Sequence, residues 1–254
     1  MGTLFMPNNQ RTQTLDHFSK YFATEKYNVI ILAGGLGTRM GQASDYIPKA
    51  LSTLGRKRAI DYIIEKYDYI AHRYVLGVSA HSDLMSSYVC GKYSHLDISF
   101  SNEKILHSTS RSAALCLDSA CSTHPTIIQF CDLIVEDPLD ITKDSLFLAT
   151  RETKGVVGTF RHAIIADEIR TLPYPEKPNN ELAGLAGIFS FGNTPLLKSL
   201  AYSSWGSHHD ITEDIVKPYK AATSMKTIHL GEIYEYGTEH DLRLVSSNSR
   251  YSDA

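Results

Sequence analysis

The sequence has few cysteines, and none of them belongs to a CxxC pair. Four occur among 254 residues, at Cys90, Cys116, Cys121 and Cys131. All four lie inside apolar runs, as small buried side chains do in proteins of a reducing compartment. We therefore predict a cytoplasmic location.

Long hydrophobic runs and an excess of charge of one sign are also absent. No stretch approaches the roughly 18 apolar residues that indicate a membrane-spanning helix, and residues 1–25 lack the apolar core and cleavage site of a secretory signal. The formal net charge is -3. The only basic cluster, at 56–58, is more simply a polar turn. We expect neither a membrane nor a nucleic acid as a partner.

The remaining composition is that of an ordinary globular enzyme, with 43% hydrophobic and 21% charged residues. The first half alternates strand and helix patterns, which predicts a parallel sheet with right-handed crossovers. Strands are expected at 27–33, 73–80, 97–102 and 126–135, and helices at 59–70, at 82–96 with Ser82 as the N-cap, and at 110–121. Later strands are expected at 155–160, 186–191 and 225–230, with a helix at 209–220.

No repeat or linker divides the chain after residue 25. The pattern predicts one α/β domain over 26–254, with a Rossmann-like, mixed but mostly parallel sheet sandwiched by helices. Residues 1–25 form a separate extension, in which Leu15, Phe18, Tyr21 and Phe22 recur at helical spacing. We expect this helix to pack on the main domain or on a second subunit, which leaves a homo-oligomer open.

The stretch "IILAGGLGTRMG" at 30–41 is the strongest functional signal. A loop that leaves the carboxyl end of the first strand lies where open α/β sheets bind ligands, and its glycines let backbone N–H groups approach phosphate oxygens. Met40 breaks the dinucleotide fingerprint GxGxxG, and the P-loop pattern is absent. Arg39 and, ten residues later, Lys49 supply two cations around one phosphate site. Such a pair is what a reaction between two anions requires.

Five motifs in order then resemble one family. "LAGGLGTRMG" followed by "PKAL" resembles the signature of the nucleotidyltransferases that make nucleotide sugars. "PKALSTLGRKRAIDYIIE", "QFCDLIV", "PEKP" with "GLAGIFSF", and "IYEYGTEHDL" are similar to the later motifs of the same family. The resemblance spans 27–245 and implies a single nucleotidyltransferase domain.

The resemblance also implies an activity and a set of site residues. Enzymes of this family join an NTP to a sugar 1-phosphate, giving an NDP-sugar and pyrophosphate. By resemblance, Arg39 acts on the leaving pyrophosphate, Lys49 on the phosphates between donor and acceptor, and Lys177 on the acceptor phosphate. Asp132 and Glu235 are expected to hold Mg²⁺. The nucleotide is assigned to Leu32, Ala33, Gly34, Gly35, Gly37, Thr38 and Arg111, and the acceptor to Glu176, Lys177, Gly187 and Asp214.

Departures from the family pattern leave the base, the acceptor and even turnover open. "STSRS" at 108–112 replaces a glycine-rich turn that contacts base and ribose, so Arg111 could read the base, bind a second phosphate or face solvent. CTP and GTP are favoured as donors. One alternative is a cytidylyltransferase for a non-sugar phosphate such as phosphocholine. Another is a regulatory module that binds nucleotide without turnover, because Cys131 replaces a glycine and Glu235 an aspartate.

Overall fold

The computed structural model describes residues 25–35, 37–40, 46–79, 81–103, 108–207, 209–248 and 251. The helix expected within residues 1–25 therefore lies outside the described residues. None of the described helices is long and apolar enough to cross a membrane.

Fourteen strands and eight helical segments are named in the described chain, and residues 38–40 form one further short 3-10 turn. The strands are β1 (Tyr27–Leu32), β2 (Thr53–Leu54), β3 (Lys57–Arg58), β4 (Ala71–Val78), β5 (Ile98–Asn102), β6 (Thr126–Phe130), β7 (Leu133–Val135), β8 (Ser145–Ala149), β9 (Lys154–Val156), β10 (Phe160–Ile165), β11 (Glu168–Glu176), β12 (Ala183–Phe191), β13 (Lys226–His229) and β14 (Glu232–Glu235). The helical segments are η2 (Lys49–Leu51), α2 (Ala59–Tyr67), α3 (Ser82–Lys92), α4 (Thr109–Asp118), α5 (Thr194–Ser203), the π-helical turn η3 (Thr212–Val216), α6 (Lys217–Ala222) and α7 (Glu239–Ser246).

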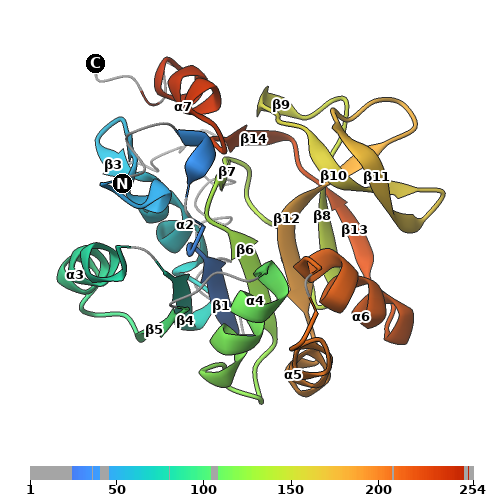
Figure 1. The fold of residues 1–254 in the computed structure, drawn as a ribbon, viewed down its shortest axis with the longest axis horizontal. Helices are drawn as coiled ribbons and strands as arrows, with labels where there is room; N and C mark the ends of the chain where they lie inside the picture. Colours follow the sequence, from blue (N-terminus) through green and yellow to red (C-terminus); the bar gives the residue numbers. More distant parts are fainter. Residues whose placement is uncertain are drawn as a thin grey trace, which may run out of the picture.

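The predicted parallel half of the sheet is confirmed. Strands β5, β4, β1 and β6 lie side by side in this order and are all parallel. Every residue of β1 is buried, because helices cover both faces of the sheet (Figure 1). Val29 and Ile31 pack in one core with α2 and α3, whereas Ile30 and Leu32 pack in the other with α4, α5 and α6. This two-sided burial explains the continuous apolar run.

The second half of the sheet is antiparallel except for the parallel pair of β13 with β8, and it contains an irregular strand. The first residues of β12 pair with β10, and its last residues pair with β6, while β8 follows its other edge. The register shifts between Leu185 and Phe189. Gly187 lies within this bulge with a φ of 72°, a conformation that favours glycine. A space therefore opens between β6 and β10 where β12 changes partners.

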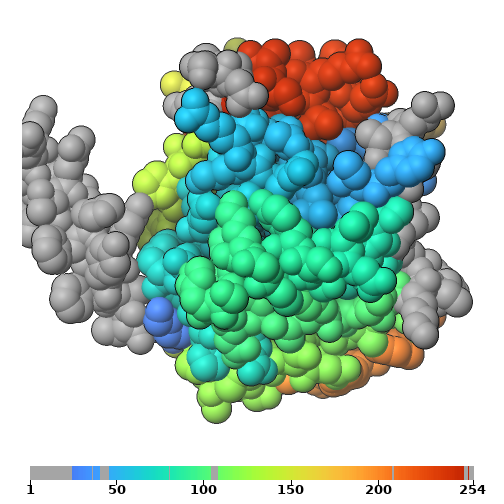
Figure 2. Space-filling view, turned by 90° about the vertical axis from the view of Figure 1, so that its left-hand side faces the viewer, coloured from blue at the N-terminus to red at the C-terminus, as the bar shows by residue number. Residues whose placement is uncertain are grey.

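A small sheet of β7, β14 and β9 lies beside the main sheet and is covered by α7. Val245 of α7 shares a small core with Leu54 of β2 and Ala59 of α2. The ring of Tyr251 packs edge-on against Tyr62. In the space-filling view, α7 closes the top of the face that β2, β3 and α2 form (Figure 2). The main domain is thus continuous from its first strand to its last helix.

The prediction of a single strand over 126–135 is wrong, because the strand is interrupted at Cys131 and Asp132, between β6 and β7. The hydroxyl of Tyr236 donates to the carbonyl oxygen of Cys131. The backbone N–H of Tyr236 donates to the carbonyl oxygen of Asp132 at 3.0 Å. The side chain of Gln129 donates to the carbonyl of Leu133 at 2.8 Å. These bonds replace the sheet pairing that a continuous strand would have.

Three other expectations need correction. Ser82 is the first helical residue of α3, and the N-cap is His81, which has a left-handed φ of 59°. The helix expected at 209–220 divides into η3 and α6, and the strand expected at 155–160 divides into β9 and the start of β10. Strands β2, β3, β8, β11 and β14 and helices α5 and α7 were not predicted.

A buried carboxylate joins α2 to α3. The side chain of Asp61 is fully buried and accepts hydrogen bonds from the backbone of Arg58, the hydroxyls of Tyr88 and Tyr93, and the Nζ of Lys92, at 2.7 to 2.8 Å. Burial alone would raise the pKa of Asp61, but these donors hold it below its ordinary value. The ionised carboxylate therefore stabilises the fold.

Replacement of this carboxylate tests that conclusion. Because the pKa of Asp61 is lowered in the folded chain, its contribution is complete above the unfolded pKa near 3.8 and is lost as the pH falls through the folded value. Asp61→Asn should therefore lower the free energy of unfolding by about 2 to 3 kcal/mol at neutral pH. The loss should shrink at about pH 3. Urea unfolding at both pH values measures this, and an equal loss at the two would contradict it.

Candidate active site

A cavity of about 540 Å³ opens at the carboxyl ends of β1 and β6, where open α/β sheets bind ligands. Its walls come from the loop after β1, the turn after β6, the start of β10 and the bulged part of β12. The lining residues are Leu32, Gly34, Gly35, Arg39, Lys49, Ser108, Thr109, Ser112 and Glu235, with residues 130–133, 159–162, 185–187, 189 and 210–212.

The glycine loop forms one wall of this cavity. Gly34 and Gly35 line it, and the carbonyl of Gly34 accepts a hydrogen bond from the hydroxyl of Ser79 at the end of β4. Gly37 has a φ of 65°, and its carbonyl accepts a bond from the backbone N–H of Met40 at 2.7 Å. This turn directs Arg39 toward the cavity. Of the other expected nucleotide residues, Leu32 lines the cavity, Ala33 is buried behind it and Thr38 is exposed.

Lys49 and Asp132 form an ion pair inside the cavity. Lys49 begins η2, directly after Pro48, and its Nζ lies 2.7 Å from the Oδ2 of Asp132. Both side chains are largely buried, at 10% and 22% exposure. Burial alone would lower the pKa of Lys49, but Asp132 holds it above its ordinary value. Lys49 is therefore a permanent cation in the free chain.

Glu235 completes the charged group. It ends β14, opposite Leu133, and its Oε2 accepts a bond from the backbone N–H of Gly158 at 3.1 Å. Burial, and then the charge of Asp132, raise the pKa of Glu235 to about 7.

Arg39, Asp132 and Glu235 surround one point in space. A Cβ added to Gly237 would lie 3.6 Å from the Nη2 of Arg39, 3.6 Å from the Oδ2 of Asp132 and 3.7 Å from the Oε1 of Glu235. The absence of a side chain at Gly237 therefore leaves a small space between one cation and two carboxylates. The structure thus brings together Arg39, Lys49, Asp132 and Glu235, and Gly187 lines the same cavity.

Besides Ala33, Gly37 and Thr38, four expected site residues lie outside the walls of this cavity. Glu176 and Lys177 are exposed, although Glu176 pairs with Phe160, which does line the cavity. Arg111 lies 3.5 Å from Glu103, and its guanidinium stacks over the ring of Trp205. Asp214 accepts 2.8 Å hydrogen bonds from two serines, Ser110 and Ser207.

A second cavity of about 530 Å³ adjoins the first, and sequence reasoning missed it. Asp210 and His162 line both cavities, and the Nε2 of His162 lies 2.7 Å from the Oδ2 of Asp210. The other oxygen of Asp210 accepts the N–H groups of Thr212 and Glu213 at the start of η3. The only sequence signal for Asp210 is that of a helix cap, which explains the residue without a ligand.

Comparisons with known proteins agree in fold rather than in sequence. No protein-family model matches the chain, and no curated protein matches its sequence. The CTP:phosphocholine cytidylyltransferase of Streptococcus pneumoniae is 19% identical with a TM-score of 0.68, over 87% of this chain and 98% of that one. A UDP-glucose pyrophosphorylase complexed with UDP-glucose is 14% identical with a TM-score of 0.68, over 89% and 98%. The inositol-1-phosphate CTP transferase of T. maritima is 14% identical with a TM-score of 0.65, over 87% and 95%. The chain therefore has the fold of solved nucleotidyltransferases.

The pairing of Lys49 with Asp132 makes a prediction about stability. Lys49→Met leaves the partly buried Asp132 carboxylate unpaired and next to Glu235. The double variant Lys49→Met/Asp132→Asn should therefore be more stable than Lys49→Met alone, by about 1 to 3 kcal/mol in urea unfolding at neutral pH.

The matched control is Lys57→Met, because Lys57 pairs with Glu65 at the surface, where both side chains are more than 40% exposed. This control should lose less than about 1 kcal/mol. A double variant no more stable than Lys49→Met would contradict the expected burial of the pair.

Proposed function

We propose that this chain transfers a nucleoside monophosphate from an NTP to the phosphate of a sugar 1-phosphate, releasing pyrophosphate. The observation that carries the proposal is the convergence of Arg39, Lys49, Asp132 and Glu235 on one cavity. Cations and carboxylates gathered at the carboxyl ends of parallel strands suit a reaction between two phosphorylated anions. The solved nucleotidyltransferases that share the fold support the same reaction class.

In this proposal, positive charge and position supply the catalysis. The attacking atom is an oxygen of an already ionised phosphate, so no general base is required. The obstacle is to bring two anions together in line at the α-phosphorus. The backbone around Gly35, Gly37 and Thr38 would hold the triphosphate. Arg39 would offset the charge that develops on the leaving pyrophosphate, and Lys49 would hold the phosphates of donor and acceptor together.

Asp132 and Glu235 fit a magnesium ion in kind and in placement. Carboxylate oxygens are the ligands that Mg²⁺ prefers, and both side chains face the space that the missing Cβ of Gly237 leaves. We propose that these two carboxylates hold Mg²⁺, which would supply positive charge at the reacting phosphate oxygens. A cation between them would also relieve their mutual repulsion.

A second acceptor class, phosphocholine with CTP as donor, is favoured by a specific observation. The residues assigned to a sugar, Glu176 and Lys177, are exposed at the end of β11 and lie outside the lining of the cavity. The adjoining cavity instead carries the carboxylates of Asp210 and Glu213, which would hold a cationic group in exchange for their present partners, His162 and Lys217. Arg161 also lines this cavity. We do not extend the proposal to Arg111 or Asp214, whose charged groups are engaged outside the cavity.

Pyrophosphate release tests the proposal directly. The full chain is incubated with Mg²⁺, each of the common NTPs in turn, and either a panel of sugar 1-phosphates or phosphocholine. Release that requires one NTP and a sugar 1-phosphate supports the proposal, whereas release with CTP and phosphocholine alone moves the acceptor to the second class. If an NTP raises the melting temperature but no pair releases pyrophosphate, the chain is a nucleotide-binding module and the proposal fails.

Removal of the loop arginine should impair turnover without affecting folding. Arg39 is exposed, so Arg39→Ala should leave the melting temperature unchanged. Its kcat should fall about 10²- to 10³-fold, as for other single groups that stabilise transition-state charge. Arg56→Ala, at the turn between β2 and β3, provides the control and should keep the normal rate. A normal kcat for Arg39→Ala would contradict the assigned role.

A methyl group at Gly237 should block the space between the charged groups. Gly237 does not have a positive φ, and the new Cβ would meet its neighbours only at ordinary contact distances. Gly237→Ala should therefore keep its free energy of unfolding within about 0.5 kcal/mol. Its half-saturating Mg²⁺ concentration for pyrophosphate release should rise by about 10-fold or more. Gly91→Ala in α3, where a Cβ meets nothing within 4 Å, is the matched control. An unchanged Mg²⁺ dependence would remove the ion from this space.

A further inference from the structure

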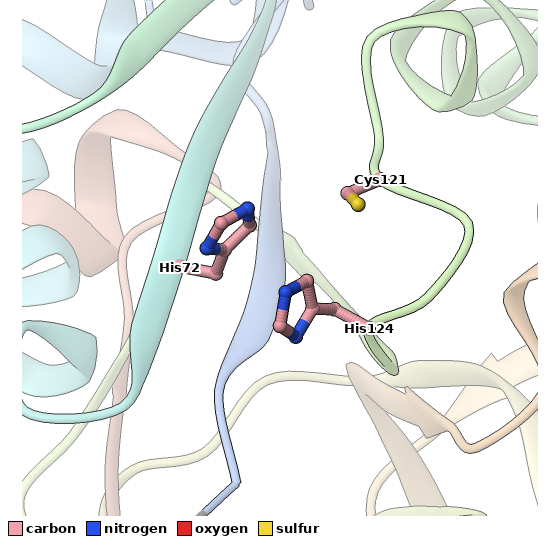
Figure 3. A group of neighbouring side chains, drawn as sticks. All are labelled: His72, Cys121 and His124. Atoms are coloured by element: carbon pink, nitrogen blue, oxygen red, sulfur yellow. The ribbon is translucent and has the colours of Figure 1, made fainter.

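Two histidines and a cysteine meet at the end of the sheet opposite the cavity. His72 lies near the start of β4, and Cys121 and His124 lie on the loop between α4 and β6. Their candidate ligand atoms all lie within 4.8 Å of one another. Figure 3 shows the three side chains pointing into the space between β4 and this loop. The two imidazole rings stack with centroids 4.0 Å apart.

The loop that carries Cys121 and His124 is hydrogen-bonded to a buried side chain of the sheet. The fully buried Asn28 of β1 donates to the carbonyls of Cys121 at 2.9 Å and His124 at 3.1 Å. Its own side-chain oxygen accepts the backbone N–H of Cys121 at 2.8 Å. One buried amide therefore holds the backbone at both positions of the loop. This arrangement is built before any ligand binds.

The hydrogen bond of His124 fixes which of its ring nitrogens can bind a ligand. Nδ1 lies 3.2 Å from the backbone carbonyl of Lys26. A carbonyl can only accept, so Nδ1 carries the proton and Nε2 keeps a free lone pair. Metal-binding histidines commonly have this second bond to a carbonyl.

We propose that His72, Cys121 and His124 bind a zinc ion, with water as the fourth ligand. Imidazole nitrogen and thiolate sulfur are the ligands that Zn²⁺ prefers. Bond lengths of about 2.0 to 2.3 Å place ligand atoms on a tetrahedral zinc about 3.3 to 3.6 Å apart. Small rotations of these partly exposed side chains close the present spacing. Arg73, the nearest cation on β4, is paired with Asp97 at 2.8 Å and bonds the carbonyl of Ser119.

The bound zinc fastens β4 to the loop that leads into β6. It lies beyond the amino ends of these strands, whereas Lys49 and Asp132 lie at the carboxyl ends. Its occupancy should therefore change the stability of the sheet and leave the cavity chemistry unaffected. This inference does not depend on the proposed function.

Cobalt and zinc binding by the full chain tests the site. The protein is first freed of metal with a chelator and then titrated with Co²⁺ in excess Mg²⁺, which occupies carboxylate sites without competing for a thiolate. One equivalent of Co²⁺ should produce a thiolate-to-cobalt charge-transfer band, and Zn²⁺ should abolish it. The band should disappear in Cys121→Ser. His72→Ala should bind more than about 100-fold more weakly, because even groups behind the ligands change metal affinity about 10- to 100-fold.

Two variants serve as matched controls, and the melting temperature gives an independent measurement. Cys90→Ser replaces the exposed cysteine of α3, and His229→Ala replaces an exposed histidine of β13, so both should bind Co²⁺ normally. Equimolar Zn²⁺ should raise the melting temperature of the wild type and both controls, but not that of Cys121→Ser. The proposal is overturned if no thiolate band forms, or if Cys121→Ser binds Co²⁺ as tightly as the wild type.

Discussion

The bonds that Tyr236 makes to the turn after β6 determine where the charged groups of the cavity lie. Its hydroxyl and its backbone N–H donate to the carbonyls of Cys131 and Asp132, and β6 ends at Phe130, just before them. The turn directs Asp132 out of the buried sheet and toward Lys49. The same fully buried tyrosine brings its neighbour Glu235 to this edge. Backbone geometry thus places both carboxylates before any ligand binds.

Charge balance in the free chain follows from this geometry. Lys49 and Asp132 neutralise each other across 2.7 Å, and burial beside Asp132 raises the pKa of Glu235 to about 7. The cavity therefore holds several charged side chains without leaving a buried charge unpaired. An unpaired buried charge would cost several kcal/mol of desolvation free energy. A triphosphate and a divalent cation would exchange these internal partners for external ones.

The sequence was sufficient to predict the parallel half of the sheet and the charged residues that the cavity brings together. The apolar run of β1 and the glycines after it are local signals, and the family resemblance supplied Asp132 and Glu235. The break at Cys131 could not be predicted, because apolar residues continue on both sides and the cause is Tyr236, about a hundred residues away. Asp210 could not be identified as a cavity residue from the sequence, because its position before a helix is already explained by a capping role. The exposure of Lys177 depends on the β10 and β11 hairpin, which has no periodic signal.

The bulge at Gly187 divides β12 into two parts with different neighbours. Beyond it, β12 pairs with β6 on one side and with β8 on the other. Before it, β12 pairs with β10 at two positions, Ala163 with Gly184 and Ile164 with Ala183. Insertions or exchanges in the hairpin of β10 and β11 would reshape one wall while the opposite wall keeps its architecture. Changes in the hairpin would therefore alter which ligand the cavity admits without rebuilding the core.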